Sequence, residues 1–321
     1  MAATNRLTFE AVELSAVSVA EFDELLSEEI GVWNERFRWD FRPSAEILRR
    51  FIQVQGLRGF AMRGPNGLLG YAYYICEGAK AVIGDFYLRS GFGGPQHGWP
   101  LLSHVIQELT NTPFIKRIES QLMLTPTPQI HSLPFSQFAK RYDRFFMEIS
   151  QQAIEQIPAR ESVDRISYVV WNDRYFEDVA QLVSASYKGH VDSEINDQYR
   201  TLPGARQFLT NIIRFPGCGR FLPQASFLAV DVKNQRICGA CLASAVSATT
   251  GHITQLCVLP AWRGTGLGHT LLRTTLNQLV RMKTEAVSLT VTSTNIDAIG
   301  LYERMGFQRL AVFPALVWER F

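Results

Sequence analysis

The sequence predicts an α/β fold that contains two copies of one unit. Apolar residues alternate along the chain between a strand-like period of two and a helix-like period near 3.6. The stretch LLSHVIQEL at residues 101–109 is matched by LLRTTLNQL at residues 271–279, so leucines recur at an offset of 170 residues. A length of 321 residues accommodates two units of about 150 residues each.

The second half shows the order of elements most clearly. Its periodicity predicts strands at 165–171, 225–232, 236–246 and 286–293, helices at 174–189, 202–215 and 295–306, and closing strands within 307–321. Between residues 252 and 272 a strand runs through a glycine-rich turn into a helix. The leucines at 271, 272, 276 and 279 keep one face of that helix apolar. Asn295 is the expected N-cap of the last helix, and Gly306 is its expected stop.

The first half repeats this plan with drifting loop lengths. Residues 59–75 predict a hairpin around an Asn-Gly turn, and residues 117–125 correspond to the strand at 286–292. The polar, proline-broken stretch 151–162 is the expected linker. We therefore expect a first domain at 1–150 and a second at 163–321.

Composition excludes several classes of protein. The formal net charge of +2 gives no general case for a nucleic-acid or membrane partner. No apolar run approaches the length of a membrane span, and the first residues lack the apolar core of a signal peptide, so a cytoplasmic location is expected. The basic and aromatic stretch 33–43 is interrupted by Glu35 and Asp40, which favours a helix end or a pocket wall over a nucleic-acid site.

The cysteines predict neither disulfides nor a metal site. Five cysteines are an odd number in a chain of this length. Cys238 and Cys241 have CxxC spacing, but they lie within an apolar, strand-like run, and no second pair completes a zinc site. Core packing is the favoured interpretation, and we expect no bound metal.

The glycine-rich turn RGTGLG, residues 263–268, predicts an anion site. Amides in the first turn of a helix have no intrahelical partners, and the helix dipole favours negative charge there. Glycines at 264, 266 and 268 let the backbone approach a phosphate, and Arg263 adds a charge-assisted donor. The turn lacks the Lys-Ser/Thr of an NTPase loop, and no acidic reader of a nicotinamide ribose follows it.

Two motifs together resemble the GNAT N-acetyltransferase superfamily. VLPAWRGTGLGHTLL is similar to its acyl-CoA pyrophosphate signature, and NIDAIGLYERMGF at 295–307 is similar to its second motif. The resemblance covers residues 163–321 and reaches the first half only through the repeat. It implies two tandem GNAT-like domains, each a mostly antiparallel twisted sheet flanked by helices. The tandem layout resembles that of some two-domain members, mycothiol synthase among them.

The resemblance implies roles for individual residues. Acetyl-CoA would be the co-substrate, and the residues that would hold its pyrophosphate and pantetheine are Arg263, Gly264, Thr265, Gly266, Leu267, Gly268, His269 and Asn295. Apolar spacing at residues 253, 256 and 258 suggests a one-residue bulge that splays the strands. The backbone N–H of Cys257 or Val258 would then polarise the thioester carbonyl. A covalent acyl intermediate on Cys257 is disfavoured, because no base is identifiably paired with it.

The acid and the base follow from the same motifs. Tyr302 stands at the position of the family's general acid. His252 stands where the family often has a carboxylate base, and imidazole can accept a proton near neutral pH, although a strand-capping role is equally compatible with the residue.

The acceptor is the least specified part of the prediction. It is expected to be an amine on a small molecule or a peptide. Asp192, Glu194 and Asp197 would suit a cationic amine, although acidic loop residues are commonly just solvated. A monomer or a homodimer is expected.

The first copy is predicted to be degenerate. Its loop GGPQHG at 93–98 replaces the arginine with glycine, and Pro95 removes an amide donor. Tyr142 lies one residue from the position opposite Tyr302, and without a coenzyme cradle we do not expect it to be catalytic. The sequence thus predicts an N-acetyltransferase that works by direct attack in a ternary complex. The alternative is a CoA-binding sensor or scaffold without chemistry.

Overall fold

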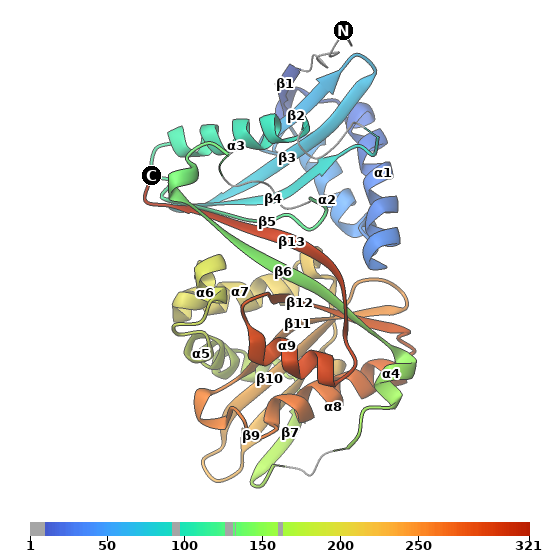
Figure 1. Ribbon diagram of the computed structural model, residues 1–321, viewed down its shortest axis with the longest axis vertical. Helices are drawn as coiled ribbons and strands as arrows, with labels where there is room; N and C mark the ends of the chain where they lie inside the picture. The colour runs from blue at the N-terminus through green and yellow to red at the C-terminus, as the bar shows by residue number, and fades with distance from the viewer. Residues whose placement is uncertain (1–9, 92–96, 126–130, 132, 160–162) are drawn as a thin grey trace. The chain divides into compact units, whose positions relative to one another are not determined.

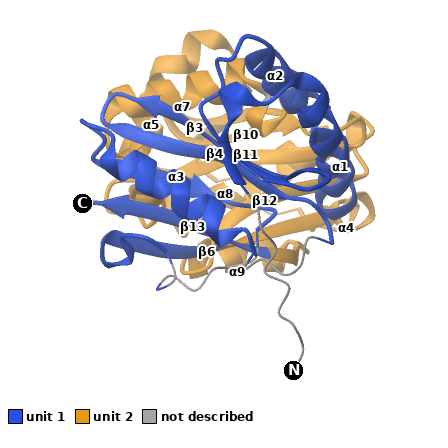
Figure 2. Ribbon diagram, turned by 90° about the horizontal axis from the view of Figure 1, so that it is seen from above, with its two compact units in different colours: residues 1–143, 312–321 blue, residues 144–311 orange. Residues whose placement is uncertain are grey.

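The computed structural model describes residues 10–91, 97–125, 131, 133–159 and 163–321. The chain divides into two compact units (Figure 2). Unit 1 comprises residues 1–143 and 312–321, and unit 2 comprises residues 144–311. None of the helices in the described part of the chain has the length and apolar character that a bilayer span requires.

Unit 1 is a six-stranded sheet with helices on both faces. Its elements are β1 (Glu10–Glu13), α1 (Val19–Phe37), α2 (Arg42–Gln53), β2 (Gly59–Gly64), β3 (Gly67–Glu77), β4 (Lys80–Leu88), α3 (Trp99–Asn111), β5 (Arg117–Gln121) and the end of β13 (Gln308–Glu319). The strands follow the order β1-β2-β3-β4-β5-β13, and only β4 and β5 are parallel (Figure 1). The expected hairpin at 59–75 is confirmed as β2 and β3.

Adjacent residues of β3 show how the two faces of this sheet are covered. Tyr71 contacts Phe22 of α1 edge-on, with ring centroids 4.9 Å apart. Ala72 points to the opposite face and packs in a cluster with α3 residues such as Leu102 and Ile106. Side-chain alternation along each strand therefore separates the α1 side from the α3 side.

The basic and aromatic stretch 33–43 lies at the end of α1 and the start of α2. The side chains of Trp33, Phe37, Trp39 and Phe41 are all buried. Trp33 stacks on Phe41 with ring centroids 5.3 Å apart. The helix-end interpretation is confirmed, because these rings pack on one another and are not exposed to stack on bases.

Unit 2 repeats the same sheet plan. Its elements are the end of β6 (Ala139–Ser150), α4 (Gln151–Glu155), β7 (Ile166–Val170), α5 (Phe176–Ser186), α6 (Asp192–Ile195), α7 (Leu202–Arg214), β8 (Arg220–Phe221), β9 (Phe227–Asp231), β10 (Arg236–Ala245), β11 (Thr250–Val258), α8 (Leu267–Arg281), β12 (Ala286–Thr292), α9 (Ile296–Arg304) and the start of β13. The strands follow the order β7-β9-β10-β11-β12-β6, and only β11 and β12 are parallel (Figure 1). The prediction of two copies of a mostly antiparallel sheet flanked by helices is confirmed.

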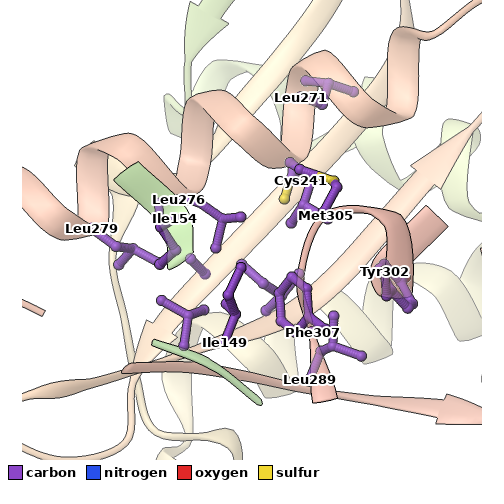
Figure 3. Packing of buried hydrophobic residues seen from close by; sticks show 14 of the residues in the cluster. Ile149, Ile154, Cys241, Leu271, Leu276, Leu279, Leu289, Tyr302, Met305 and Phe307 are labelled. Atoms are coloured by element: carbon purple, nitrogen blue, oxygen red, sulfur yellow. The ribbon is translucent and has the colours of Figure 1, made fainter. Parts of the chain in front are cut away.

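The two faces of the unit 2 sheet carry separate apolar clusters. One cluster joins the sheet to α8, α9 and α4, and it contains the four predicted leucines of α8, which are fully buried. Figure 3 shows part of this cluster, with Leu271, Leu276 and Leu279 of α8 facing the sheet. The other cluster joins the sheet to α5 and α7. Cys238 and Cys241 lie in the first cluster as free thiols, which confirms their packing role.

Each copy gives its last strand to the other unit. β6 closes the first copy in sequence, but its residues 144–150 pair with β12 of unit 2. β13 closes the second copy, but its residues 315–319 pair with β5 of unit 1. The compact units therefore differ from the expected linear domains 1–150 and 163–321, and part of the expected linker forms α4. Period-two alternation predicts that a segment is a strand but carries no information about which sheet receives it.

The repeat is also visible in the register of the strands. β4 pairs with β5 only as far as Ile83 and Ser120, and β11 pairs with β12 only as far as Ile253 and Leu289. Both β4 and β11 carry a one-residue bulge directly after these positions. The offset of 170 residues between Ile83 and Ile253 is the offset found in the sequence.

A buried carboxyl pair joins α1 to β4 in unit 1. Tyr71 donates a hydrogen bond to Glu29 at 2.7 Å, and Trp33 Nε1 donates to the other oxygen at 3.1 Å. Glu29 also hydrogen-bonds Asp85, and burial raises the pKa of both carboxyls, that of Glu29 well above its usual range. Two adjacent carboxyls in a dry site cannot both ionise readily, so we expect the pair to keep one proton at neutral pH.

We predict that replacing Glu29 with glutamine stabilises the protein at pH 8 and changes little at pH 4.5. The pKa of Glu29 is higher in the folded state than in the unfolded state. Protonated Glu29 therefore adds to the free energy of unfolding below the unfolded-state pKa. As pH rises from there toward the folded-state pKa, this contribution falls by roughly 1 kcal/mol per pH unit. Thermal unfolding across this pH range measures the effect. Glu24→Gln, on the exposed side of α1, is the control. A variant that unfolds at the same temperature as the parent at pH 8 would contradict the shared proton.

Candidate active site

The bulge predicted in the strand before the glycine turn is confirmed. On β10, Leu242 pairs with Gln255 and Ala243 pairs with Ile253, so Thr254 is the extra residue of β11. Its Oγ1 donates a hydrogen bond to Leu242 O at 3.1 Å. Because pairing with β12 ends at Ile253, residues 254–258 have lost their neighbour on that side. We call this segment the open edge of β11.

The strand register distinguishes Val258 from Cys257. Leu259 N–H donates to Cys238 O of β10 at 2.9 Å, and alternate residues of an antiparallel ladder bond to the same neighbour. Cys257, in register with Ala240, therefore directs its N–H toward β10. The N–H of Val258 points to the open edge and is available to a carbonyl oxygen. Burial raises the pKa of the Cys257 thiol to about 12, which further disfavours a covalent acyl intermediate.

The glycine turn leaves the start of α8 open. Gly264 and Gly266 have φ of +76° and +89°, and a Cβ atom added at either would meet nothing within 4 Å. α8 begins at Leu267 with no side-chain cap and no acidic residue in its first turn. The amides of 267–269 therefore lie at a positive helix end with no competing acceptor from a cap.

The side chains around this turn differ in their availability. Leu267 and His269 are buried, so only their backbone faces the turn. Thr265 Oγ1 donates to Trp262 O at 2.8 Å, and the Arg263 guanidinium donates to Ser186 O at 2.7 Å. Arg263 is thereby held against the end of α5, beside the turn.

Gly268 is the point where the two predicted motifs meet. A Cβ atom built on Gly268 would lie 3.7 Å from Val258 Cγ2 and 3.8 Å from Leu301 Cδ2. The glycine turn, the open edge of β11 and α9 therefore converge at one place in unit 2. Tyr302 follows Leu301 on α9, and Figure 3 shows its side chain beside the apolar cluster.

The corresponding position of unit 1 is closed. A Cβ atom on Gly98 would lie 2.2 Å from Leu88 Cδ1 and 2.8 Å from Phe86 Cζ, so α3 begins directly against β4. Pro100 also removes an amide from the first turn of α3. Residues 92–96, which include Pro95 of the predicted degenerate loop, lie outside the described residues. Tyr142 lies on strand β6, whereas Tyr302 lies on a helix.

α9 begins after Asn295 and carries Tyr302 in its last turn. The Asn295 side chain accepts a hydrogen bond from Ala298 N–H at 3.3 Å, which confirms the N-cap, and Gly306 ends the motif with φ of +101°. Tyr302 is 8% exposed. Burial, with smaller contributions from Cys241 and Asp192, raises the pKa of its phenol, which therefore keeps its proton at neutral pH.

His252 lies in an environment that suits a structural histidine better than a base. It precedes the bulge, is 6% exposed, and its Nδ1 lies 2.9 Å from Ser288 Oγ. Its ring stacks on Phe146 of β6. Burial, helped by Arg144, lowers the pKa of His252 to about 3. An imidazole of such low basicity is poorly matched to an ammonium of pKa near 10.

A polar network that the sequence did not reveal lies on the α5 side of the open edge. Gln255, the residue after the bulge, donates to the Tyr187 hydroxyl at 2.7 Å and accepts from the Tyr199 hydroxyl at 3.5 Å. The Tyr187 and Tyr199 rings are stacked, with centroids 4.2 Å apart. The one available signal was the position of Gln255, a polar residue directly before the apolar residues 256–258.

Asp192, one of the three acidic residues proposed for the acceptor, is linked to this network through His190, whose ring packs edge-on against Tyr187 with centroids 5.1 Å apart. Thr292 Oγ1, at the end of β12, donates to Asp192 at 2.5 Å. His190 Nδ1 accepts a hydrogen bond from the backbone N–H of Asp192 at 3.1 Å. The other ring nitrogen, Nε2, lies 3.3 Å from Nδ2 of Asn295. Glu194 instead lies 3.6 Å from Arg200. Asp197 begins the short helical turn that follows.

The described residues hold no group of three or more His, Cys, Asp or Glu side chains arranged to bind a metal ion. What they do bring together is an uncapped helix start, a strand edge whose Val258 N–H points outward, a protonated phenol and a carboxylate. This combination is suited to holding a phosphorylated carrier and an amine next to an activated carbonyl.

Solved structures of known proteins share the fold. A GCN5-related N-acetyltransferase from Sphaerobacter thermophilus superposes with a TM-score of 0.67 at 18% identity, over 97% of this chain and 95% of that chain. A tandem GNAT protein from the clavulanic acid biosynthesis pathway superposes with a TM-score of 0.66 at 16% identity, over 97% and 98%. The protein therefore has the fold of a tandem GNAT protein.

The family comparison concerns unit 2, and one curated relative matches a short part of the chain. Residues 192–307 match the model of the acetyltransferase (GNAT) family. The N-alpha-acetyltransferase 30 of Dictyostelium discoideum is 38% identical over 60 residues, which are 19% of this chain. The match spans 32% of that relative's own length. The match to the GNAT family model thus covers a little over a third of the chain and lies within unit 2.

Proposed function

We propose that unit 2 transfers an acetyl group from acetyl-CoA to a primary amine by direct attack in a ternary complex. The observation that carries this proposal is the convergence at Gly268 of the open α8 start, the Val258 edge and α9. The family match over residues 192–307 supports the same chemistry.

The turn and the start of α8 would bind the pyrophosphate. Amides at 264–269 and the Arg263 guanidinium supply its donors, and Asn295 lies at the start of α9 for the pantetheine arm. Only glycine leaves the backbone of this turn as accessible as it is at 264 and 266.

The reaction forms a C–N bond and breaks the C–S bond of the thioester. The Val258 N–H stabilises the oxygen on which negative charge develops. The sulfur leaves as a thiolate and receives a proton from Tyr302, which burial keeps protonated. Asp192 replaces His252 as the proposed acceptor of the proton that the ammonium loses before it attacks, because it contacts Thr292 and lies close enough to Tyr302 to act on its pKa. The nitrogen loses a second proton as the amide forms, and this proton restores the Tyr302 hydroxyl.

A thiol-release assay on the full chain tests this function. We expect free thiol to appear only when acetyl-CoA and an amine are both present, and acetylated amine to appear in equal amount. Tight binding of acetyl-CoA without turnover on amino acids, polyamines, aminoglycosides or peptides would favour the sensor or scaffold alternative. An exposed cysteine, Cys218, makes a control without amine necessary.

A further inference from the structure

Two opposite charges flank the end of β12 on the amine side of unit 2. Thr292 Oγ1 donates to the Asp192 carboxylate at 2.5 Å. Arg144 of β6 stands directly opposite Thr292 in the antiparallel register. Side chains of directly opposite residues lie on the same face, with Cβ atoms about 5 Å apart. Asp192 and Arg144 therefore bracket Thr292 on one face of the sheet.

The position of Arg144 is fixed by contacts along β12. Its Nη2 donates to Thr290 Oγ1 at 3.2 Å, and Thr290 is in register with Phe146. Arg144, Phe146, Thr290 and Thr292 thus share the face that also carries His252. This is the face opposite the cluster around α8.

Electrostatics place both charges near the reacting groups. Burial is the main cause of the raised pKa of Tyr302; Asp192 raises this pKa further, and Arg144 lowers it. The same two residues act in the same opposite directions on the pKa of Tyr199 in the aromatic pair. The charges of Asp192 and Arg144 therefore both act on Tyr302 and on Tyr199, which lie on separate segments.

We propose that the acceptor is an amine that also carries a carboxylate, with Asp192 facing its amine and Arg144 facing its carboxylate. This inference rests on the proposed acetyl transfer by unit 2. A guanidinium matches the planar geometry of a carboxylate, and it repels a second cation. Amino acids therefore fit the site better than polyamines or aminoglycosides do.

The proposal gives the first copy a role in unit 2. Arg144 belongs to the strand that closes the first copy in sequence and pairs with β12. The donated strand supplies the specificity residue for the acceptor as well as the sixth strand of the sheet.

Matched acceptor pairs test the proposal on the full chain. Acetyl transfer would be measured with glycine and glycinamide, with phenylalanine and phenethylamine, and with spermidine. The parent is expected to prefer each carboxylate-bearing acceptor by at least about 10-fold in kcat/KM, and to use spermidine poorly. Equal use of the two members of each pair, or a preference for spermidine, would overturn the inference.

Variants of Arg144 separate a binding role from a structural one. Arg144→Gln should reduce the carboxylate preference by about 10- to 100-fold, mainly through KM, and Arg144→Lys should restore part of it. Arg144→Glu should shift the preference toward spermidine. Arg309→Gln is the control, because Arg309 lies over Phe145, on the other face of β6. A preference that Arg144→Gln and Arg144→Glu leave unchanged would contradict the assignment.

The two proposals fail in different ways. Absence of thiol release with every acceptor would remove the proposed function, together with this inference. Turnover without a carboxylate preference would leave the proposed function intact and remove only the acceptor class. Binding of acetyl-CoA by each variant confirms that unit 2 is folded in these comparisons.

Discussion

Tyr302→Phe is expected to lower kcat by about 100-fold or more while leaving the affinity for acetyl-CoA nearly unchanged. The substitution removes the hydroxyl that we propose donates to the leaving sulfur, and it keeps the buried ring, whose centroid lies 5.8 Å from that of Phe307. The substitution is therefore expected to slow the chemical step and not to weaken the binding of acetyl-CoA. Steady-state kinetics with a saturating amine, together with calorimetric binding of acetyl-CoA, measure the two effects separately.

The pH dependence adds a second test of this role. Burial raises the pKa of Tyr302, so its ionisation should not reduce kcat of the parent below about pH 10. Tyr175→Phe is a suitable control, because that hydroxyl is engaged by Arg174. Unchanged turnover in Tyr302→Phe would remove the acid assignment. An alkaline loss of kcat below pH 9 that vanishes in this variant would contradict the raised pKa.

Gly268→Asp is expected to weaken binding of acetyl-CoA by about 100-fold without unfolding unit 2. The added Cβ would make ordinary contacts at 3.7 Å and 3.8 Å, and an acidic residue in the first turn of a helix is favourable for folding. The new carboxylate would instead repel the pyrophosphate, and a few kcal/mol of repulsion at close range corresponds to this loss.

The control for this prediction is Gly268→Ala, which adds the Cβ without the charge. It should bind acetyl-CoA within about 10-fold of the parent, since the contacts of the Cβ are not close. Thermal unfolding of both variants monitors the fold. If Gly268→Asp bound acetyl-CoA as well as Gly268→Ala does, the start of α8 would not be the pyrophosphate site.

Local features of the site were predictable from the sequence because each rests on neighbouring residues. The spacing of apolar residues 253, 256 and 258 reveals the bulge, since a strand with one extra residue shifts its alternation. The glycine turn and the Asn295 cap likewise depend on a few consecutive positions. These features also locate the convergence at Gly268.

Features that depend on distant segments were not predictable. The exchange of β6 and β13 leaves the alternation of both strands unchanged, so the sequence cannot indicate it. The environment of His252 depends on Phe146, which the exchanged strand brings into unit 2. The placement of Asp192 against Thr292 likewise joins residues 100 positions apart. Roles read from motif positions alone therefore differ from the roles that burial and charge favour.

The number of acetyl-CoA molecules bound per chain tests the central claim most directly. The claim is that one copy holds the coenzyme, because α8 begins with an open turn, whereas α3 begins against Leu88 and Phe86. Native mass spectrometry and calorimetry of the full chain should give one acetyl-CoA per chain, and the Gly268→Asp variant should lose it. Two molecules per chain, or one that persists in this variant, would contradict the assignment of the active site to unit 2.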